Sequence, residues 1–276
     1  MSSEHSGNTD TNNTGINNTA TNNTAIDKAH LYNSPEQLLA GKTIVVTGAG
    51  AGIGRAAALC FAHYGATVVL LGKTVAKLEA IYDEIEAVGY PQPAIYPLHL
   101  GGAAMDDYRE LAASLEQTFG HIDGLLHNAS MLGDRKPIAQ TNSDEWQQVM
   151  QVNVNAQFML TQALLPLLEQ APNGSIIFTS SSVGRRGRAY WGPYAVSKFA
   201  TEGLMQTLAQ ELANTSAVRV NSLNPGATDT AMRRTAYPGE NPNQNPQAEA
   251  IMPLYLYLMG DESIGVTGQA LDAQPK

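Results

Sequence analysis

Short apolar runs alternate with longer amphipathic stretches along most of the chain. Residues 55–64, 74–88, 105–119, 146–168, 193–214 and 251–259 show the helical spacing of apolar positions. The short runs are rich in β-branched residues and predict strands at 42–47, 67–71, 94–98, 174–180, 218–223 and 266–272, with a fourth strand leading into 124–130. This alternation predicts an α/β fold of the doubly wound, Rossmann type. We expect a single domain with a mostly parallel sheet of about seven strands, flanked by helices.

The beginning of the chain does not follow this pattern. Met1 to His30 consists mostly of Asn, Thr, Ser, Gly and Ala, with repeated Asn-Asn-Thr. Such a segment buries too little apolar surface to offset the entropy cost of ordering, so 1–30 is predicted to be a disordered polar tail. It lacks the basic and apolar regions of a secretion signal.

Composition and charge narrow the class of protein. The single cysteine, Cys60, excludes an intrachain disulfide framework and suits a reducing compartment. No apolar run is long enough to span a bilayer, and the formal net charge of -9 argues against general nucleic-acid binding. We therefore expect a cytoplasmic protein that binds neither membranes nor nucleic acid.

A glycine-rich turn joins the first predicted strand to the first predicted helix. It reads Gly48-Ala-Gly-Ala-Gly-Ile-Gly54, in the context that a dinucleotide-binding turn requires. Gly48 allows the tight turn, Gly52 lets the backbone approach a pyrophosphate, and Gly54 lets helix and strand pack closely. The phosphates then lie at the helix N-terminus. The alternative is a glycine turn that binds no ligand.

A tyrosine and a lysine four residues apart carry the candidate chemistry. On a helix, Tyr194 and Lys198 lie on one face. An ammonium beside a phenol is expected to lower the tyrosine pKa from about 10 toward the working pH, so that the phenol can exchange a proton with an alcohol oxygen. Ser181 follows a predicted strand, which would bring its hydroxyl to the ligand-binding edge of the sheet. Taken alone the pair is weak, because many solvated helix faces carry one.

Together these residues resemble the short-chain dehydrogenase/reductase family. The resemblance covers about Leu39 to Asp272, and the glycine spacing matches the family's Thr-Gly-x-x-x-Gly-x-Gly pattern. The motifs at 179–184, 197–203 and 251–255 are most similar to the bacterial YciK-like oxidoreductases, a subgroup named for a protein whose substrate is not established. The resemblance implies that residues 31–276 form an NAD(P)-binding domain carrying both the cofactor and the substrate sites.

The same resemblance implies a role for each catalytic candidate. Tyr194 would exchange the proton with the substrate oxygen, and Ser181 would orient that oxygen. Lys198 would lower the Tyr194 pKa and bond the nicotinamide ribose. Asn153, within Val152-Asn-Val-Asn155, matches the family asparagine that helps to hold a water in the proton relay. For Asn153 a purely structural role is the alternative, because a buried asparagine must satisfy its hydrogen bonds.

The end of the second predicted strand bears on the choice of cofactor. Many NAD-binding relatives have an acidic residue there, whereas this chain has Gly72 followed by Lys73. A missing carboxylate and a new cation suit a 2′-phosphate, which favours NADP over NAD. The alternative for Lys73 is an exposed loop lysine. The full set of cofactor contacts implied by the resemblance is Gly48, Gly52, Ile53, Gly54, Lys73, Asn128, Ala129, Tyr194, Lys198, Pro225, Gly226, Thr228 and Thr230.

Two histidines mark departures from the family pattern. His99 stands near the position of the aspartate that usually contacts the adenine, so we expect a different adenine contact. His127 and Ser130 replace residues of the family's Asn-Asn-Ala-Gly segment. We expect structural roles for both histidines, and no metal site.

The predicted function is NADP-dependent transfer of a hydride between the nicotinamide and a carbonyl or secondary alcohol, with a tyrosine as general acid or base. The alternative is a non-catalytic NADP-binding sensor or scaffold on the same fold. A sensor would be expected to have lost part of the Asn-Ser-Tyr-Lys tetrad. Relatives commonly form dimers or tetramers through two long helices, here near 146–168 and 193–214, so a homodimer or homotetramer is expected.

Two segments near the expected active site carry further hypotheses. Arg185, Arg186 and Arg188 follow Ser181, and their forked donors suit carboxylate or phosphate. One or more of them is hypothesised to steer an anionic substrate; the alternative is a solvated loop or salt bridges to a neighbouring subunit. Residues 237–248 are rich in Pro, Asn and Gln and are expected to form a mobile lid.

Overall fold

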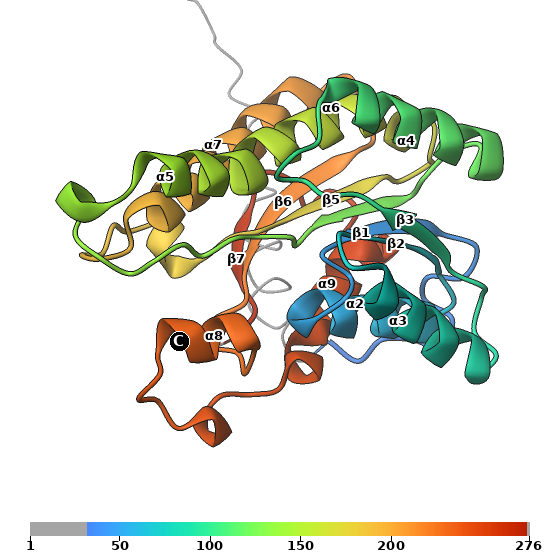
Figure 1. Cartoon of the computed structure of the whole chain (residues 1–276). Coiled ribbons are helices and arrows are strands. Elements are labelled where there is room, and N and C mark those ends of the chain that lie inside the picture. The colour runs from blue at the N-terminus through green and yellow to red at the C-terminus, as the bar shows by residue number, and fades with distance from the viewer. Residues whose placement is uncertain (1–31, 275–276) are drawn as a thin grey trace, which may run out of the picture.

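The computed structural model describes residues 32–274, so the predicted tail at 1–30 lies outside the described residues. Seven parallel strands form one sheet in the order β3-β2-β1-β4-β5-β6-β7 (Figure 1). They are β1 (Thr43–Thr47), β2 (Thr67–Gly72), β3 (Ala94–Pro97), β4 (Gly124–His127), β5 (Ser175–Thr179), β6 (Arg219–Asn224) and β7 (Ala270–Asp272). The order reverses between β1 and β4, which confirms the predicted doubly wound fold. A ligand site is expected at this switch point, beyond the carboxyl ends of the strands.

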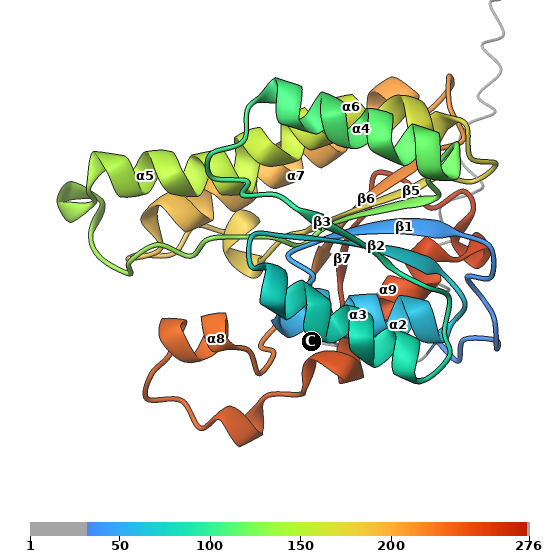
Figure 2. The ribbon, with the colours of Figure 1, turned by 45° about the vertical axis from the view of Figure 1, so that its right-hand side comes forward.

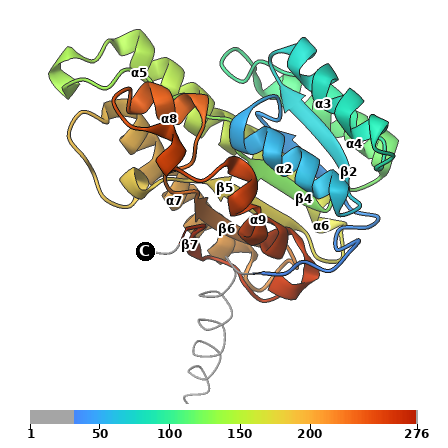
Figure 3. The same cartoon turned by 90° about the horizontal axis from the view of Figure 1, so that it is seen from below.

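Helices cover both faces of the sheet (Figures 1 and 2). One layer contains α2 (Gly52–His63), α3 (Val75–Ala87) and α9 (Met252–Met259). The other contains α4 (Met105–Phe119), α5 (Ser143–Met150), α6 (Ala156–Glu169) and α7 (Gly192–Leu212). The short helix α8 (Ala231–Ala236) lies apart from both layers, at one end of the sheet (Figures 1 and 3).

Alternate residues of each central strand pack into the two layers. Ile44 and Val46 belong to the apolar cluster under α2 and α9, whereas Val45 belongs to the cluster under α4 and α6. All three side chains are fully buried. A strand buried on both faces reads as a continuous apolar run, and this is why these strands were predictable from sequence.

The helix predicted at 146–168 contains a change of winding. It begins earlier, at Ser143, and a π-helical segment, Gln151–Asn155, separates α5 from α6. A π segment inserts an extra residue into a helical turn, and such segments are frequent at functional sites. Asn153 lies inside it, and its side chain is fully buried.

The predicted last strand is shorter than expected. Of residues 266–272 only Ala270–Asp272 form a strand, β7. Before it, the Gly268 N–H donates to the Val220 carbonyl at 2.7 Å and the Ser222 N–H donates to the Gln269 carbonyl at 2.9 Å. Gly268 has a φ of +70°, which a regular strand does not allow. The segment therefore follows β6 without forming a regular ladder until Ala270.

Side-chain contacts hold part of the stretch at 237–248, which was predicted to be a mobile lid. The Glu240 carboxylate accepts a hydrogen bond from Arg233 Nε at 2.7 Å and another from Asn245 Nδ2 at 2.9 Å. These partners lower the pKa of Glu240 to about 2. A 3-10 turn, Pro242–Gln244, lies between them. The predicted loop is therefore present and is tied to α8 through Arg233, while its mobility stays a prediction.

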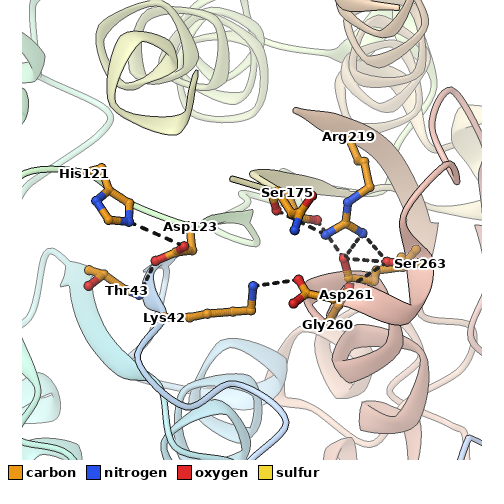
Figure 4. A network of polar contacts seen from close by, with 11 residues as sticks. Lys42, Thr43, His121, Asp123, Ser175, Arg219, Gly260, Asp261 and Ser263 are labelled. Atoms are coloured by element: carbon orange, nitrogen blue, oxygen red, sulfur yellow. Dashed lines mark hydrogen bonds and ion pairs between the residues drawn. The ribbon is translucent and has the colours of Figure 1, made fainter. Parts of the chain in front are cut away.

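A polar network closes the amino-terminal edge of the sheet (Figure 4). Asp123, just before β4, accepts the Thr43 N–H of β1 at 2.8 Å. Lys42 pairs with Asp261 at 2.8 Å, and Arg219 of β6 donates to the Leu258 carbonyl at 2.9 Å. These contacts join the starts of three strands to the segment around α9, and they leave the opposite edge for ligands.

Two absences hold for the described part of the chain. None of the helices within 32–274 combines the length and apolar character needed to cross a bilayer. In the same range, no three His, Cys, Asp or Glu side chains are grouped closely enough to hold a metal ion.

Candidate active site

The predicted site residues gather at the carboxyl-terminal edge of the sheet. Parallel strands bring their carboxyl ends to one edge, so the segments that follow β1, β2, β4, β5 and β6 meet there. These segments carry Gly48–Gly54, Lys73, Asn128–Ala129, Ser181 and Pro225–Thr230. Tyr194 and Lys198 arrive on the first turns of α7, beside the turn that contains Ser181.

A glycine lets the Ser181 turn pack closely against α7. Ser181 is the N-cap of a 3-10 turn, Ser182–Gly184, and its hydroxyl accepts the Val183 N–H at 3.5 Å. A Cβ at Gly184 would lie 2.7 Å from the Lys198 Cβ and 2.8 Å from the Lys198 carbonyl oxygen. Only a residue without a side chain fits at that distance. The close packing brings Ser181 within hydrogen-bonding reach of Tyr194.

The environment of Tyr194 differs from the prediction. Its side chain is buried, and burial raises the pKa of Tyr194 to about 12, although the hydrogen bond with Ser181 opposes the shift. We predicted that Lys198 would lower this pKa. The ammonium instead lies over the tyrosine ring, 5.5 Å from its centroid. Desolvation of the phenol therefore decides the net direction of the pKa shift, which is opposite to the direction predicted.

Lys198 is almost completely enclosed. Its side chain is 1% exposed, and Nζ donates to the Thr179 carbonyl at 2.8 Å. Burial lowers the pKa of Lys198 to about 8, while the nearby Glu202 carboxylate acts in the opposite direction. At neutral pH the ammonium is thus the main form, with its proton held less tightly than that of an exposed lysine.

Asn153 braces the segment that follows β4. Its amide nitrogen donates to the Met131 carbonyl and to Ser197 Oγ, both at 2.9 Å, and its Oδ1 accepts the Met131 N–H at 2.7 Å. Both N–H groups of the side-chain amide and its oxygen are therefore engaged within the protein. Its visible role is structural, the alternative that the sequence left open, and its backbone carbonyl accepts from Thr201 Oγ1 at 3.4 Å.

The glycine turn fits a dinucleotide. Gly48 has a φ of +67°, and a Cβ there would lie 3.0 Å from the Ala129 Cα. A Cβ at Gly54 would lie 2.2 Å from the Gly48 carbonyl oxygen and 2.5 Å from Asn128 Nδ2. Gly52 has a φ of +53° and is exposed, so its backbone is accessible to a ligand. The turn is thus packed closely against the segment after β4 on one side and open on the other, with Ile53 half-buried at the start of α2.

Thr47 holds this turn to the end of β4. Its hydroxyl donates to the Leu126 carbonyl at 3.1 Å and accepts the N–H groups of Asn128 and Ala129 at 2.9 and 3.0 Å. The Asn128 side chain returns a hydrogen bond to the Thr47 carbonyl at 3.2 Å. Our sequence reasoning gave Thr47 no role, although its place directly before Gly48 in the family pattern was a usable signal.

The segment after β6 is held from the far end of the chain. Gln274 Nε2 donates to the carbonyls of Pro225 and Ala227, both at 2.9 Å, and Thr228 Oγ1 donates to the Pro225 carbonyl at 3.2 Å. Gly226 has a φ of +75°, and a Cβ there would meet the Gln274 side chain. Sequence reasoning missed Gln274, because nothing in its neighbourhood marks it.

Thr230 joins this segment to the glycine turn. It caps α8 by accepting the Arg233 N–H at 3.1 Å, and its methyl carbon lies 3.4 Å from where a Cβ of Gly52 would be. The loops after β1 and β6 therefore face each other, as two walls of one cofactor site would.

The lysine at the end of β2 is exposed and available. Lys73 makes no hydrogen bond or ion pair with any described residue. Lys77, on the first turn of α3, lies beside the glycine turn, with its Cβ 3.0 Å from where a Cβ of Gly50 would be. Lys77 is therefore a second cation near the glycine turn, and sequence reasoning did not select it.

The two histidines occupy different environments. His127 is buried, stacks on Phe178 with ring centroids 4.6 Å apart, and pairs Nε2 with Thr161 Oγ1 at 2.8 Å. Burial and the Lys198 charge lower the pKa of His127 to about 3, so it is neutral at physiological pH. This agrees with the structural role predicted for His127. His99 is exposed after β3, with Gly101 and Gly102 packed against its ring.

Of the three arginines that follow Ser181, Arg185 is bound within the protein. Arg185 Nε donates to Glu202 at 2.9 Å, Nη1 to Asp272 at 2.8 Å and Nη2 to the Leu271 carbonyl at 3.0 Å. Glu202 also accepts from Ser222 Oγ at 2.6 Å. This network occupies Arg185, which leaves Arg186 and Arg188 as the candidates for steering a substrate. Glu202, a buried carboxylate one turn after Lys198, was also missed.

Known proteins share this sequence and fold. Residues 42–241 match the family model described as short chain dehydrogenase. The oxidoreductase YciK of Escherichia coli K12, itself uncharacterised, is 51% identical over 244 residues, which cover 88% of this chain and 96% of YciK.

Solved structures agree with this match. A protein described as a short chain dehydrogenase, from Pseudomonas syringae, is 59% identical, with a TM-score of 0.85 over 88% of this chain and 99% of that one. A short chain dehydrogenase of Shigella flexneri, complexed with NADP, is 52% identical, with a TM-score of 0.85 over 87% of this chain and 100% of that one.

Proposed function

The chain belongs to the short-chain dehydrogenase/reductase family, and on this basis we propose that it is an NADP-dependent oxidoreductase that interconverts a carbonyl and a secondary alcohol. The observation that carries the proposal is the meeting of Ser181, Tyr194 and Lys198 at the sheet edge that also bears the glycine turn. Proton exchange and nucleotide binding are thereby brought to one place.

The residues present fit an NADP molecule. The open side of Gly48–Gly54 at the start of α2 would receive the pyrophosphate, with Thr230 and the 225–228 segment opposite it. Lys73 would bind the 2′-phosphate, and the Shigella relative complexed with NADP supports that choice of cofactor. When bound, the cofactor supplies or accepts the hydride.

Tyr194 is the proposed proton donor. Because its pKa is raised to about 12, the phenol is protonated at neutral pH, which is the form that donates to a developing alkoxide. Ser181, which hydrogen-bonds Tyr194, would donate to the same substrate oxygen and hold it beside the phenol.

Lys198 would make proton loss from Tyr194 less costly. Its ammonium lies over the Tyr194 ring and would stabilise the phenolate left after proton transfer. The buried position excludes water, which strengthens this interaction. Asn153 would keep the π segment in shape so that Ser197, next to Lys198, stays in place.

Tyr194→Phe tests the mechanism. The variant removes one hydroxyl, so the fold is expected to survive, and turnover of a carbonyl panel, followed by loss of NADPH absorbance, should fall by roughly 10²–10⁴-fold with NADPH affinity unchanged. Tyr108→Phe is the matched control, because Tyr108 is buried in α4 and its hydroxyl has no partner in the described structure. Near-normal turnover by Tyr194→Phe would refute the mechanism. NADPH binding without turnover of any carbonyl by the unmodified protein would favour the sensor alternative.

We further propose a homo-oligomer formed through α6 and α7. Phe158 on α6 and Val196 and Phe199 on α7 expose 50%, 39% and 45% of their surface. Large apolar side chains exposed on two helices of one layer support an association surface there. Light scattering of the purified protein gives the mass directly, and Phe199→Glu should lower it to that of one chain.

The compartment is proposed to be the cytoplasm. The single cysteine, Cys60, is half-buried in α2, and burial raises the pKa of its thiol to about 12, so it is poorly reactive. A chain with a single cysteine forms no intrachain disulfide, which is typical of proteins in a reducing compartment. Fractionation of cells that express the full chain would test this assignment.

A further inference from the structure

Three arginines from separate parts of the chain meet around one tyrosine. The Arg135 guanidinium carbon lies 4.7 Å from the ring centroids of both Tyr237 and Trp191. Arg233 lies 3.8 Å from the Tyr237 centroid, and Arg188 Nη1 donates to the Tyr237 hydroxyl at 2.9 Å. Arg135 follows β4, Arg188 follows β5, and Arg233 is on α8, so the tertiary fold brings these charges together.

This arginine cluster (Arg135, Arg188 and Arg233) lies next to the proposed proton donor. Trp191 packs on Tyr237 and on Tyr194, with ring centroids 5.8 Å apart in each case. One aromatic ring thus separates the Arg135 guanidinium from Tyr194. Figures 1 and 2 show α8 at the same end of the sheet as α5 and the segment before it.

The acidic groups around the cluster already have cationic partners. Glu240 binds Arg233, and Asp229 binds Arg234 at 2.8 Å. Asp134 and Glu145, on either side of the Arg135 segment, both bind Lys136. Within residues 32–274 no carboxylate lies at ion-pair distance from Arg135 or Arg188. A chain of net charge -9 therefore keeps two uncompensated positive charges at this place.

Both arginines retain free donors. A guanidinium carries five N–H donors. Arg135 uses Nη1 for the Ala236 carbonyl, and Arg188 uses Nη1 for Tyr237; both side chains are exposed. The remaining N–H groups suit the paired oxygens of a carboxylate or phosphate. By contrast, Glu240 and Asp229 neutralise the arginines lining the hollow between α8 and residues 237–245, so that hollow is a weaker candidate for an anion.

We propose that Arg135 and Arg188 bind an oxyanion, carboxylate or phosphate, on the substrate and so direct its carbonyl end toward Tyr194. The inference rests on the proposed function and gives it a substrate class: a small carbonyl compound with an acidic group at its other end. Arg185, which the sequence suggested, is occupied by Glu202 and Asp272. Arg135, which lies 50 residues earlier in the chain, is available for the anion in its place.

The experiment measures binding without turnover. The NADPH complex of Tyr194→Phe is titrated calorimetrically with levulinate and its longer keto-acid homologues, each beside its methyl ester. Dihydroxyacetone phosphate beside dihydroxyacetone forms the phosphate arm. At least one acid is expected to bind ten-fold or more tightly than its neutral partner, and the arm in which this occurs identifies the oxyanion.

Arginine variants then assign the residues. Arg188→Gln and Arg135→Gln, each in the Tyr194→Phe background, should weaken binding of that acid by about ten-fold, as expected for a lost charged hydrogen bond, and change binding of the neutral partner by less than about two-fold. Arg109→Gln is the control, because Arg109 is an exposed arginine on α4. Since Arg135 also packs on two rings, Arg135→Lys keeps the charge there and should recover part of the affinity.

Two results would overturn the inference: no acid bound more tightly than its neutral partner, or equal weakening of both partners in the arginine variants. The outcome is independent of the test of the reaction. Acid binding that depends on Arg188, together with unchanged turnover in Tyr194→Phe, would keep the anion site and reject the mechanism.

Discussion

Replacing the buried lysine with an apolar residue should stabilise the protein that has no cofactor bound. Lys198 is 1% exposed, and burial lowers its pKa from 10.5 to about 8. Charged Lys198 is therefore less favourable in the folded than in the unfolded chain at neutral pH. Methionine has a similar length and no charge, so Lys198→Met removes this unfavourable contribution.

The expected magnitude follows from the pKa shift. The shift corresponds to about 3 kcal/mol of unfavourable free energy at pH 7, at roughly 1.4 kcal/mol per pKa unit. The variant loses the hydrogen bond from Nζ to the Thr179 carbonyl, which is worth about 1 kcal/mol. We expect the free energy of unfolding to rise by about 1–3 kcal/mol, and the melting temperature by about 2–4 °C for each kcal/mol.

The pH dependence gives a sharper signature than the magnitude. Between pH 8 and 10.5 the unfolded chain holds a proton on Lys198 that the folded protein has released, so this group makes the unmodified protein more stable as pH rises. The variant lacks this contribution. Its advantage should therefore shrink, by about 2 kcal/mol between pH 7 and pH 9.5.

Urea unfolding at pH 7 and 9.5 measures both quantities. Lys73→Met is the matched control, because Lys73 is exposed and its replacement should change the stability by less than about 0.5 kcal/mol at either pH. A Lys198→Met variant less stable than the unmodified protein at pH 7, or a stability difference that does not change with pH, would refute the reasoning.

Further substitutions test the cofactor site and the network behind Ser181. Lys73→Asp replaces attraction for a 2′-phosphate with repulsion and should raise the KM for NADPH at least ten-fold more than that for NADH; equal effects would leave Lys73 as a surface lysine. Gly54→Ala places a Cβ 2.2 Å from the Gly48 carbonyl oxygen, so calorimetry should find NADPH affinity lost, whereas Gly203→Ala, with open space around its Cβ, should leave it intact. Arg185→Gln strands the buried Glu202 and should cost about 2–4 kcal/mol in urea unfolding, below the cost for a fully buried pair because Arg185 is 26% exposed, and Arg186→Gln should cost almost nothing.

The sequence predicted what depends on local pattern. Continuous β-branched runs mark strands buried on both faces, and Ile44, Val45 and Val46 are such a run. The glycine turn was predictable because the positive φ at Gly48 and the contact distance at Gly54 each require glycine. The spacing of Tyr194 and Lys198 on a helix likewise fixes their common face.

The sequence pattern could not predict which polar groups are buried or which distant residues they contact. Sequence places an ammonium near the phenol of Tyr194, but it does not reveal that both groups are removed from water, and desolvation reverses the expected pKa shift. Arg185 stands in a run of three arginines that looks solvated, yet its partner Asp272 lies 87 residues away. The strand predicted at 266–272 is shorter in the structure because Gly268 adopts a positive φ, which the sequence pattern does not reveal.

Because Gln274 binds the 225–228 segment, the nucleotide site is completed late in the synthesis of the chain. On the ribosome, the glycine turn is synthesised more than 200 residues before Gln274. At ~5–20 residues per second, this is an interval on the order of ten seconds or longer. During that time the first half of the sheet can form, but the 225–228 segment lacks its hydrogen bonds to Gln274. A nascent chain should therefore gain full affinity for its nucleotide only after Gln274 has been made and has bound the 225–228 segment.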